Sequence, residues 1–215
     1  HKVEVAQYLD RVEGVAAELG AVNVIVNRDG ELVGHNTDVE GFRLSMEKSG
    51  AKVEGAEVAV LGAGGAARSV IRALIDAGAG GIHLFNRTLS KAEETADALG
   101  GADAGIDVRA FSDAEVDTTI ADCSIIINAT SAGLRADEEP PINPALIRRG
   151  QLVVDLIYEP WKTRLLEASE TAGATTANGY GMLVFQAFEA FRLWTGHTPP
   201  LDAMWEAGLR EGLNG

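Results

Sequence analysis

From residue 57 onward, short apolar runs alternate with amphipathic segments. Residues 58–61 form a continuous apolar run, as expected for a strand that is buried on both faces of a parallel sheet. Further strands are predicted at residues 81–85, 108–111, 124–128, 152–157 and 174–177, and helices at residues 66–77, 90–99, 114–120 and 165–172. Strands that alternate with helices are typical of βαβ units. The pattern therefore predicts an α/β fold with a doubly wound parallel sheet.

The two ends of the chain show other patterns. Apolar residues at helical spacing predict a helix over residues 3–19, and strands at 21–27 and 31–35 follow around a turn. A helix over residues 39–48, capped by Thr37 or Asp38, comes next, and helices at 182–195 and 201–213 close the chain. We therefore expect two domains. Residues 51–179 form a nucleotide-binding domain, and residues 1–50 with 180–215 form part of a second α/β domain that holds the substrate.

Composition limits the partners and the setting of the protein. Of the 215 residues, 46% are hydrophobic and 23% are charged, which is ordinary for a globular protein. The net charge of −14 argues against a nucleic-acid partner. No apolar run is long enough to span a membrane, so no membrane partner is predicted. The single cysteine, Cys123, favours a reducing, cytoplasmic setting. His35, His83 and His197 lack the spacing of metal ligands, so no metal is predicted.

A glycine-rich turn follows the first strand of the predicted parallel sheet. Gly62, Gly64 and Ala67 match the pattern G-x-G-x-x-A between a strand and a helix. Such a turn brings backbone N–H groups and the positive end of a helix against a pyrophosphate, although a purely structural turn can also collect glycines. The expected cofactor contacts are Gly62, Ala63, Gly64, Gly65 and Ala66.

The end of the second strand indicates which dinucleotide binds. An NAD site usually has an acidic residue there, which accepts hydrogen bonds from the ribose 2′-hydroxyl. This chain instead has Asn86, Arg87 and Thr88, followed by Lys91. A guanidinium binds a 2′-phosphate with charge-assisted hydrogen bonds, whereas an acid would repel it. We therefore expect NADP, with all four residues at the cofactor; the alternative is that Arg87 and Lys91 are simply solvated.

Further residues follow the later strands, at the edge where open α/β sheets bind ligands. Asn128 and Thr130 come after the fourth strand, and Tyr158 comes after the fifth. We expect Asn128, Thr130, Ile157 and Gly179 to contact the cofactor on its nicotinamide side. Asn128 could instead only begin a turn.

Taken in order, these motifs resemble those of the shikimate dehydrogenase family. The resemblance covers nearly the whole chain, through residues 1–2, 20–23, 36–38, 62–67, 86–88, 128–130 and 178–186. It implies reversible hydride transfer between NADP(H) and the shikimate/3-dehydroshikimate pair, a small-molecule substrate of aromatic amino acid biosynthesis. We expect the chain to lack the family's N-terminal segment, which carries a serine-x-serine motif for the substrate.

The resemblance also implies catalytic and substrate-binding residues. Lys2 is the expected proton donor and acceptor, with Asp38 as its charged partner. Asn23, Asp38 and Gln186 are expected to hydrogen-bond ring hydroxyls of the substrate, and Tyr158 to border the pocket. Each has a plainer alternative, because Lys2 could be a solvated cation, Asp38 a helix cap and Gln186 a solvent-facing side chain.

Three other functions remain open at this point. A quinate/shikimate dehydrogenase paralogue would have a broader substrate range or would use NAD. The NADP domain of a glutamyl-tRNA reductase shares the glycine turn, but the motifs at residues 36–38 and 179–186 disfavour it. The third alternative is an NADP-binding module without catalytic activity. The oligomeric state also remains open, with a homodimer as one possibility.

Overall fold

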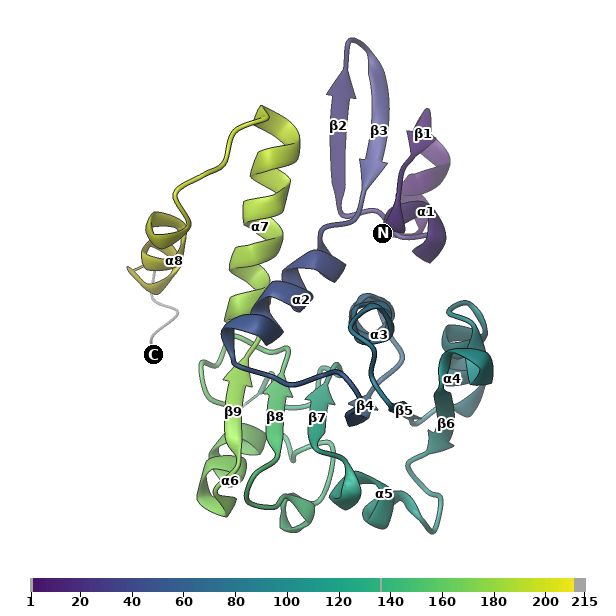
Figure 1. The fold of residues 1–215 in the computed structure, drawn as a ribbon, viewed down its shortest axis with the longest axis vertical. Helices are drawn as coiled ribbons and strands as arrows, with labels where there is room; N and C mark the ends of the chain where they lie inside the picture. Colours follow the sequence, from purple (N-terminus) through teal and green to yellow (C-terminus); the bar gives the residue numbers. More distant parts are fainter. Residues whose placement is uncertain (1, 136, 211–215) are drawn as a thin grey trace.

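The computed structural model describes residues 2–135 and 137–210, and these residues form two sheets with helices around them (Figure 1). The larger sheet is parallel, with the strand order β6-β5-β4-β7-β8-β9. The smaller sheet, in the order β1-β3-β2, is built by the N-terminal part of the chain. The predicted α/β fold with a doubly wound parallel sheet is therefore confirmed.

Most elements lie within a few residues of their predicted ranges. The strands of the larger sheet are β4 (Glu57–Leu61), β5 (Gly81–Asn86), β6 (Ile106–Ala110), β7 (Ile125–Asn128), β8 (Leu152–Asp155) and β9 (Thr175–Asn178). The helices between these strands are α3 (Gly65–Asp76), α4 (Leu89–Asp97), α5 (Val116–Asp122) and α6 (Arg164–Ala172), with short 3-10 helices at Gly101–Ala104 and Pro144–Leu146.

The two ends of the chain supply the remaining elements. The N-terminal part contains a 3-10 helix (Glu4–Tyr8), β1 (Arg11–Val12), α1 (Val15–Leu19), β2 (Val24–Arg28), β3 (Glu31–His35) and α2 (Asp38–Lys48). The C-terminal part contains α7 (Tyr180–Thr195) and α8 (Leu201–Arg210). Residues 211–213 of the last predicted helix lie outside the described residues.

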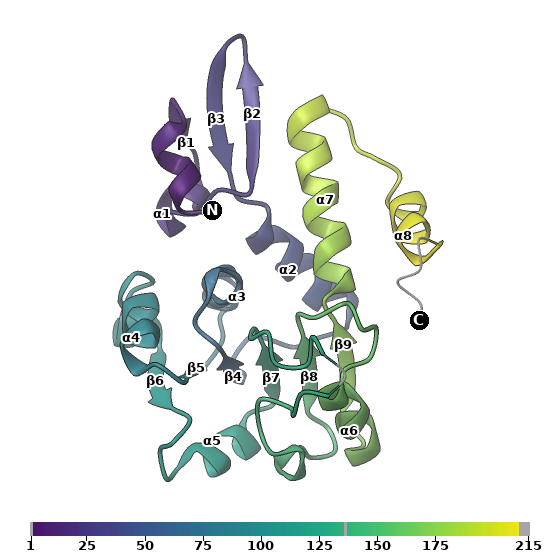
Figure 2. The ribbon, with the colours of Figure 1, turned by 180° about the vertical axis from the view of Figure 1, so that it is seen from behind.

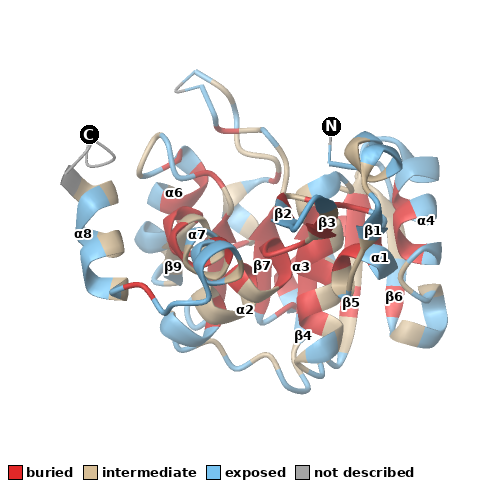
Figure 3. Ribbon diagram, turned by 90° about the horizontal axis from the view of Figure 1, so that it is seen from above, coloured by how far each residue is buried: buried red, intermediate tan, exposed pale blue. Residues whose placement is uncertain are grey.

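The central strand β4 is buried on both faces, as its apolar run predicted. Val58 and Val60 belong to the core that includes α2, α3 and α4, whereas Ala59 and Leu61 belong to the core that includes α5 and α6. Figures 1 and 2 show α3 and α4 on one side of the sheet and α5 and α6 on the other. In Figure 3 the buried residues form a band along the central strands, and the outer faces of the helices are exposed.

The order of the strands creates a crevice at one edge of this sheet. From β4 the chain moves outward through β5 to β6, then crosses back to β7 and continues to β8 and β9. Loops that leave β4 and β7 therefore diverge at the carboxyl ends of these strands, where open α/β sheets bind ligands. The carboxyl ends of β7, β8 and β9 point toward α2, α7 and the small sheet (Figures 1 and 2).

The helix predicted over residues 3–19 is wrong. Asp10 and Glu13 donate backbone hydrogen bonds to Leu32 and Gly34, which places Arg11–Val12 in the small sheet as a strand parallel to β3. Gly14, with a φ of 55°, then turns the chain into the short helix α1. The apolar residues with helical spacing are thus shared among a 3-10 helix, a strand and α1, because pairing with a distant strand outweighs local helical preference.

Helix α2 connects the two parts of the molecule. Val39, Phe42 and Met46 lie in the same core as β4 and α3. On another side of α2, Gly41 lies so close to α7 that an added Cβ would be 2.8 Å from the backbone nitrogen of Gln186. Glycine at this position therefore allows α2 and α7 to cross in direct backbone contact. No helix among the described residues is both long and apolar enough to span a membrane.

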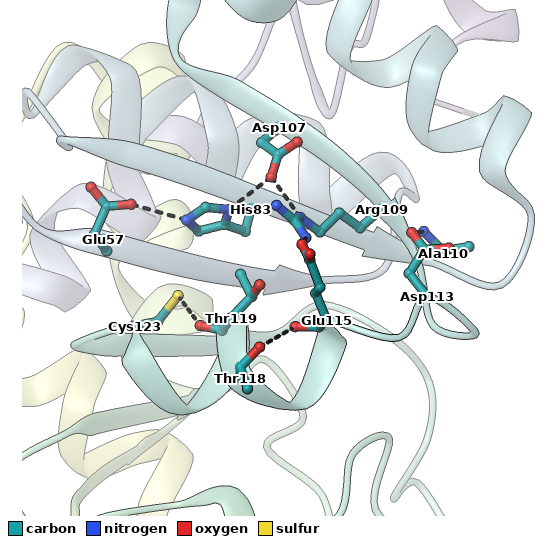
Figure 4. A network of polar contacts seen from close by, with 10 residues as sticks. All are labelled: Glu57, His83, Asp107, Arg109, Ala110, Asp113, Glu115, Thr118, Thr119 and Cys123. Carbon is teal, nitrogen blue, oxygen red and sulfur yellow. Dashed lines mark hydrogen bonds and ion pairs between the residues drawn. The ribbon is translucent and has the colours of Figure 1, made fainter.

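A polar network crosses three strands on the face of the sheet that α5 covers (Figure 4). His83 on β5 lies between two carboxylates, with Nε2 2.9 Å from Glu57 on β4 and Nδ1 3.1 Å from Asp107 on β6. The Nε of Arg109 donates to Asp107 at 2.6 Å, and the same guanidinium donates to Glu115 at 3.0 Å. The network holds the outer strands β5 and β6 to β4 and to the start of α5.

We expect this network to stabilise the fold at neutral pH and to lose that effect in acid. Burial by itself would raise the pKa of Asp107, but hydrogen bonds from Arg109 and His83 hold it below the ordinary value of an aspartate. A carboxylate with a depressed pKa stabilises the fold fully above its unfolded pKa of about 4, and loses this effect as the pH falls through its folded pKa. We expect Asp107→Asn to reduce the acid dependence of the unfolding free energy below about pH 5. Denaturant titrations of both proteins between about pH 6 and pH 3 measure this difference, and parallel curves would contradict it.

Candidate active site

The chain turns from β4 into α3 through a glycine loop. Gly62 has a φ of 100°, and an added Cβ would lie 2.9 Å from Thr130 Cγ2 and 3.1 Å from the carbonyl oxygen of Ala129. The loops that follow β4 and β7 thus touch at Gly62, where only glycine fits. At Gly64 and Gly65 the situation differs, because no described protein atom lies within 4 Å of an added Cβ.

A cavity of about 760 Å³ opens over this loop, within the size range of small-molecule sites. It is lined by residues that follow four neighbouring strands: Gly62, Ala63, Gly64, Asn86, Arg87, Phe111, Ala129, Thr130, Ser131, Ala132, Glu138, Glu139 and Pro141. Helix α3 begins at Gly65, so its unpaired N–H groups and positive end lie at this cavity. The arrangement suits an anionic ligand.

The end of β5 adds a cation to the same cavity. Arg87 lines the cavity, is exposed, and makes no ion pair with any described residue. Lys91, in the first turn of α4, does not line the cavity, but it is also exposed and unpaired within the described chain. Asn86 donates from Nδ2 to the carbonyl oxygen of Thr88 at 2.8 Å, which shapes the turn that carries Arg87. Both guanidinium and ammonium groups are therefore available to a phosphate.

Two acidic residues also line the cavity, but both already have partners. Glu138 accepts a hydrogen bond from the backbone N–H of Gly133 at 3.0 Å. Glu139 pairs with Arg164 at 2.8 Å. These contacts reduce the repulsion that the two carboxylates exert on an anionic ligand.

Asn128 plays a structural part that the sequence analysis raised only as an alternative. It is fully buried, and its Nδ2 donates to Asp155 Oδ1 at 3.0 Å and to the carbonyl oxygen of Ala132 at 3.2 Å. Its Oδ1 accepts from the backbone N–H and the hydroxyl of Thr130 at 3.0 and 2.6 Å. With every polar atom of its side chain engaged, Asn128 shapes the loop, and Thr130 is the residue of this pair that lines the cavity.

Ile157 and Gly179 lie together at the end of β8. The Ile157 side chain is buried, and its carbonyl oxygen accepts a hydrogen bond from the N–H of Gly179 at 3.1 Å. The side chain of Leu156 is less buried, and an added Cβ on Gly179 would overlap the Leu156 carbonyl oxygen at 1.9 Å. Packing alone therefore explains Gly179. Leu156, which the sequence analysis did not select, is more accessible to a ligand than Ile157.

The substrate-side motifs meet in one hydrogen-bonded group. Lys2 Nζ lies 2.5 Å from Asp38 Oδ2, across 36 residues of sequence, and Asn23 Nδ2 donates to Asp38 Oδ1 at 2.9 Å. The Asp38 side chain is only 2% exposed, whereas that of Lys2 is 46% exposed. The amine is thus held on a buried carboxylate while one side of it remains open. His1, the other member of this motif, lies outside the described residues.

The start of α2 is capped differently from the prediction. Neither Thr37 nor Asp38 caps the helix with its side chain. Instead, Asn36 Oδ1 accepts from the N–H of Asp38 at 2.9 Å, and Asn23 Oδ1 accepts from the N–H of Thr37 at 2.9 Å. The Asp38 carboxylate is therefore free of the capping role and is available to Lys2.

Gln186 and Tyr158 are not part of this hydrogen-bonded group. Gln186 on α7 is half-buried and lies against Gly41, one helical turn after Asp38 on α2. Tyr158 is 37% exposed in the loop that follows β8. Neither side chain makes a hydrogen bond to another described residue. Both are thus free to contact a ligand.

Phe111 was not among the predicted site residues. Its side chain follows β6, stacks on Phe85 with ring centroids 6.0 Å apart, and lines the same cavity as Arg87. Its signal was an aromatic residue at the end of the third strand of the parallel sheet. No group of three or more His, Cys, Asp or Glu side chains in the described residues is arranged to hold a metal ion.

Comparison with known protein families gives two matches. The family described as shikimate / quinate 5-dehydrogenase matches residues 44–158, and the shikimate 5′-dehydrogenase C-terminal domain matches residues 179–207. A shikimate dehydrogenase (NADP(+)) from Moorella thermoacetica is 42% identical over 215 residues, which cover 99% of this chain and 72% of that protein.

Solved structures resemble the chain in the same way. Shikimate 5-dehydrogenase from Thermus thermophilus in complex with NADP(H) and shikimate has a TM-score of 0.84 and 34% identity, covering 97% of this chain and 75% of the other. Quinate dehydrogenase from Corynebacterium glutamicum in complex with NAD has a TM-score of 0.90 and 32% identity, with coverage of 97% and 74%. From its sequence, its fold and its site, this chain belongs to the shikimate dehydrogenase family.

Proposed function

We infer that this chain acts as an NADP-dependent shikimate dehydrogenase, an oxidoreductase that reversibly reduces 3-dehydroshikimate to shikimate. The family membership supports this activity, and so does the chemistry of the site. The observation that carries it is the Lys2 ammonium held 2.5 Å from the buried Asp38. This pair provides a positioned proton donor, which reduction of a ketone to an alcohol requires.

The residues in each part of the chain indicate which function that part has. We propose residues 51–179 as the NADP-binding domain, because the glycine loop and Arg87 both lie on its sheet. We propose residues 1–50 and 180–215 as the catalytic domain, because Lys2, Asp38 and Gln186 lie there. The carboxyl edge of the larger sheet points toward the second part, which is the arrangement that hydride transfer between the two requires.

The cavity over the glycine loop fits a dinucleotide. Gly64 and Gly65 have open space where a side chain would stand, which supports a ligand rather than packing as the reason for glycine at these positions. The pyrophosphate would accept hydrogen bonds from the first N–H groups of α3, next to Ala63 and Ala66. Arg87 and Lys91 would bind the 2′-phosphate, with Asn86 and Thr88 shaping the turn. When bound, NADP supplies or takes up the hydride.

Proton transfer falls to Lys2. In the reducing direction, its ammonium donates a hydrogen bond to the carbonyl oxygen of the substrate and then transfers the proton to the forming alkoxide. In the oxidising direction, the neutral amine takes the proton from the hydroxyl. Asp38 keeps Nζ in place, and Asn23 in turn fixes the Asp38 carboxylate by its second oxygen.

The remaining substrate contacts come from three sides. Asn23 already uses both of its N–H groups on Thr37 and Asp38, and its Oδ1 accepts from the backbone N–H of Thr37. The second lone pair of Oδ1 is therefore the position left to accept from a ring hydroxyl. Gln186 approaches from α7, and Tyr158 borders the pocket from the loop after β8. Ile157 and Gly179 would meet the nicotinamide side through their backbone only.

Other expectations about partners stay predictions. Repulsion by the net charge of −14 supports the absence of a nucleic-acid partner. The absence of a membrane partner, the cytoplasmic setting and a homodimer also stay predictions. The resemblance to a quinate dehydrogenase keeps quinate as a second candidate substrate.

The activity is tested by absorbance of the reduced nicotinamide. The full-length protein would receive shikimate or quinate, each with NADP or NAD, and the highest kcat/KM is expected for shikimate with NADP. Lys2→Ala should lower kcat by about a hundredfold or more and leave NADP binding intact, because it removes only the proton donor. Lys52→Ala, at an exposed lysine, is the matched control. Full activity of Lys2→Ala would exclude Lys2 from the mechanism.

Arg87 is expected to determine the preference for NADP. Arg87→Ala should weaken NADP binding by about thirtyfold, or about 2 kcal/mol, because it removes a charge-assisted contact with the 2′-phosphate. NAD binding should change little. Titration calorimetry with both nucleotides measures this, with the exposed Arg148→Ala as control. Equal losses for NADP and NAD would show that Arg87 does not recognise the phosphate.

The two glycines of the loop should respond in opposite ways. Gly62→Ala should lower the free energy of unfolding by about 2 kcal/mol or more, because of its positive φ and the contact with Thr130. Gly64→Ala should leave stability nearly unchanged and weaken NADP binding by about tenfold, because its methyl group enters the cavity. Thermal unfolding and nucleotide titration separate the two effects. A Gly64→Ala variant with wild-type affinity would show that the cofactor does not approach this turn.

A further inference from the structure

Asp155 is a buried carboxylate without a cation. It ends β8, is 0% exposed, and burial raises the pKa of its carboxyl group. Among the described residues it has no ion-pair partner. Placing such a group in a protein interior costs free energy unless hydrogen bonds satisfy it. The hydrogen bonds of Asp155 must therefore offset this cost.

Three hydrogen bonds satisfy this carboxylate, and all three partners are donors. Oδ1 accepts from Asn128 Nδ2 at 3.0 Å and from the backbone N–H of Ile157 at 3.1 Å. Oδ2 accepts from the Thr163 hydroxyl at 2.7 Å. A carboxylate has only acceptors, so it matches this set of donors, and charge makes each bond stronger than one to a neutral group.

Each partner belongs to a different segment at the carboxyl edge of the sheet. Asn128 holds the loop after β7, because its other hydrogen bonds go to Thr130 and Ala132, which line the cavity. Ile157 belongs to the loop after β8 that leads to Tyr158. Thr163 is the N-cap of α6, where its hydroxyl accepts from the N–H of Leu166 at 3.4 Å. One side chain thus determines the relative positions of three segments.

We propose that Asp155 is a positioning residue for hydride transfer. Its hydrogen bonds fix the position of loop 129–132 relative to loop 156–158, and these two loops place the nicotinamide end of the cofactor. The proposal rests on the proposed function, in which the nicotinamide lies over the ends of β7 and β8. The adenosine end would lie over the end of β5, where Arg87 is located, and neither Arg87 nor Asn86 makes a hydrogen bond to Asp155 or its partners. Asp155 therefore acts on one end of the cofactor only.

Asp155→Asn is the most informative variant, because it keeps the shape of the side chain. Its amide oxygen can still accept from Asn128 and Ile157, while its amide nitrogen faces Thr163, whose hydroxyl must turn to accept. The variant removes the charge and reverses one hydrogen bond. The affinities of NADPH and of adenosine 2′,5′-bisphosphate, which lacks the nicotinamide, are then compared by titration.

We expect Asp155→Asn to weaken NADPH binding by about tenfold and to leave the bisphosphate within about twofold of its wild-type affinity. The kcat should also fall by about tenfold, with a larger deuterium isotope effect from 4-deuterated NADPH, because a displaced nicotinamide slows the hydride step. Asp107→Asn, which removes a hydrogen-bonded carboxylate that does not line the cavity, is the matched control and should change none of these values.

Equal losses for the two ligands, or wild-type values for both ligands and for the isotope effect, would overturn the proposal. If Asp155→Asn does not fold, Thr163→Val, which removes the donor to Oδ2, decides by the same comparison, and Thr163→Ser should restore the wild-type ratio of affinities. The ligand affinities are measured without substrate. A wild-type protein without shikimate turnover would therefore refute the proposed function while the comparison still decides the role of Asp155.

Discussion

The contact between the glycine loop and the loop after β7 is the constraint on which the site depends. Gly62 allows the chain to leave β4 at a positive φ, and its missing side chain lets Thr130 and Ala129 approach to contact distance. A side chain at this position would push the two loops apart. The crevice at the reversal of strand order would then lose its shape, and with it the cavity that both loops line.

The same chemical device recurs in both halves of the molecule. Asn23 donates to Asp38 at 2.9 Å at the start of α2, and Asn128 donates to Asp155 at 3.0 Å at the ends of β7 and β8. In each pair a carboxamide holds a buried carboxylate and uses its own oxygen to bind a neighbouring turn. The difference lies in the remaining partner. Asp38 holds the Lys2 ammonium, whereas Asp155 holds only neutral donors, which is why we propose proton transfer for the first pair and loop positioning for the second.

An acidic protein that binds an anionic cofactor needs cations that are not already neutralised. Arg43, Arg72 and Arg109 each form ion pairs with two carboxylates of the protein. Their charges are therefore already neutralised. Arg87 and Lys91 have no such partner in the described chain, although the net charge is −14. Attraction of the cofactor therefore depends on local pairing rather than on the overall charge.

The sequence by itself determined the parallel sheet, the glycine loop and the cations at the end of β5. These features depend on short-range rules: periodic burial, the φ that a turn demands, and the residue type that follows a strand. Such rules cannot predict interactions between residues that are distant in the sequence. The strand Arg11–Val12 formed where helical spacing predicted a helix, because β3 offered backbone partners.

Only the tertiary structure decided the roles of residues within the site. Sequence order cannot show that both polar atoms of the Asn128 amide are engaged inside the protein, or that Gly179 is required by the Leu156 carbonyl. Nor could it show that Phe111 lines the cavity. Each of these facts depends on which atoms from distant parts of the chain meet within hydrogen-bonding or van der Waals distance, and packing alone determines that.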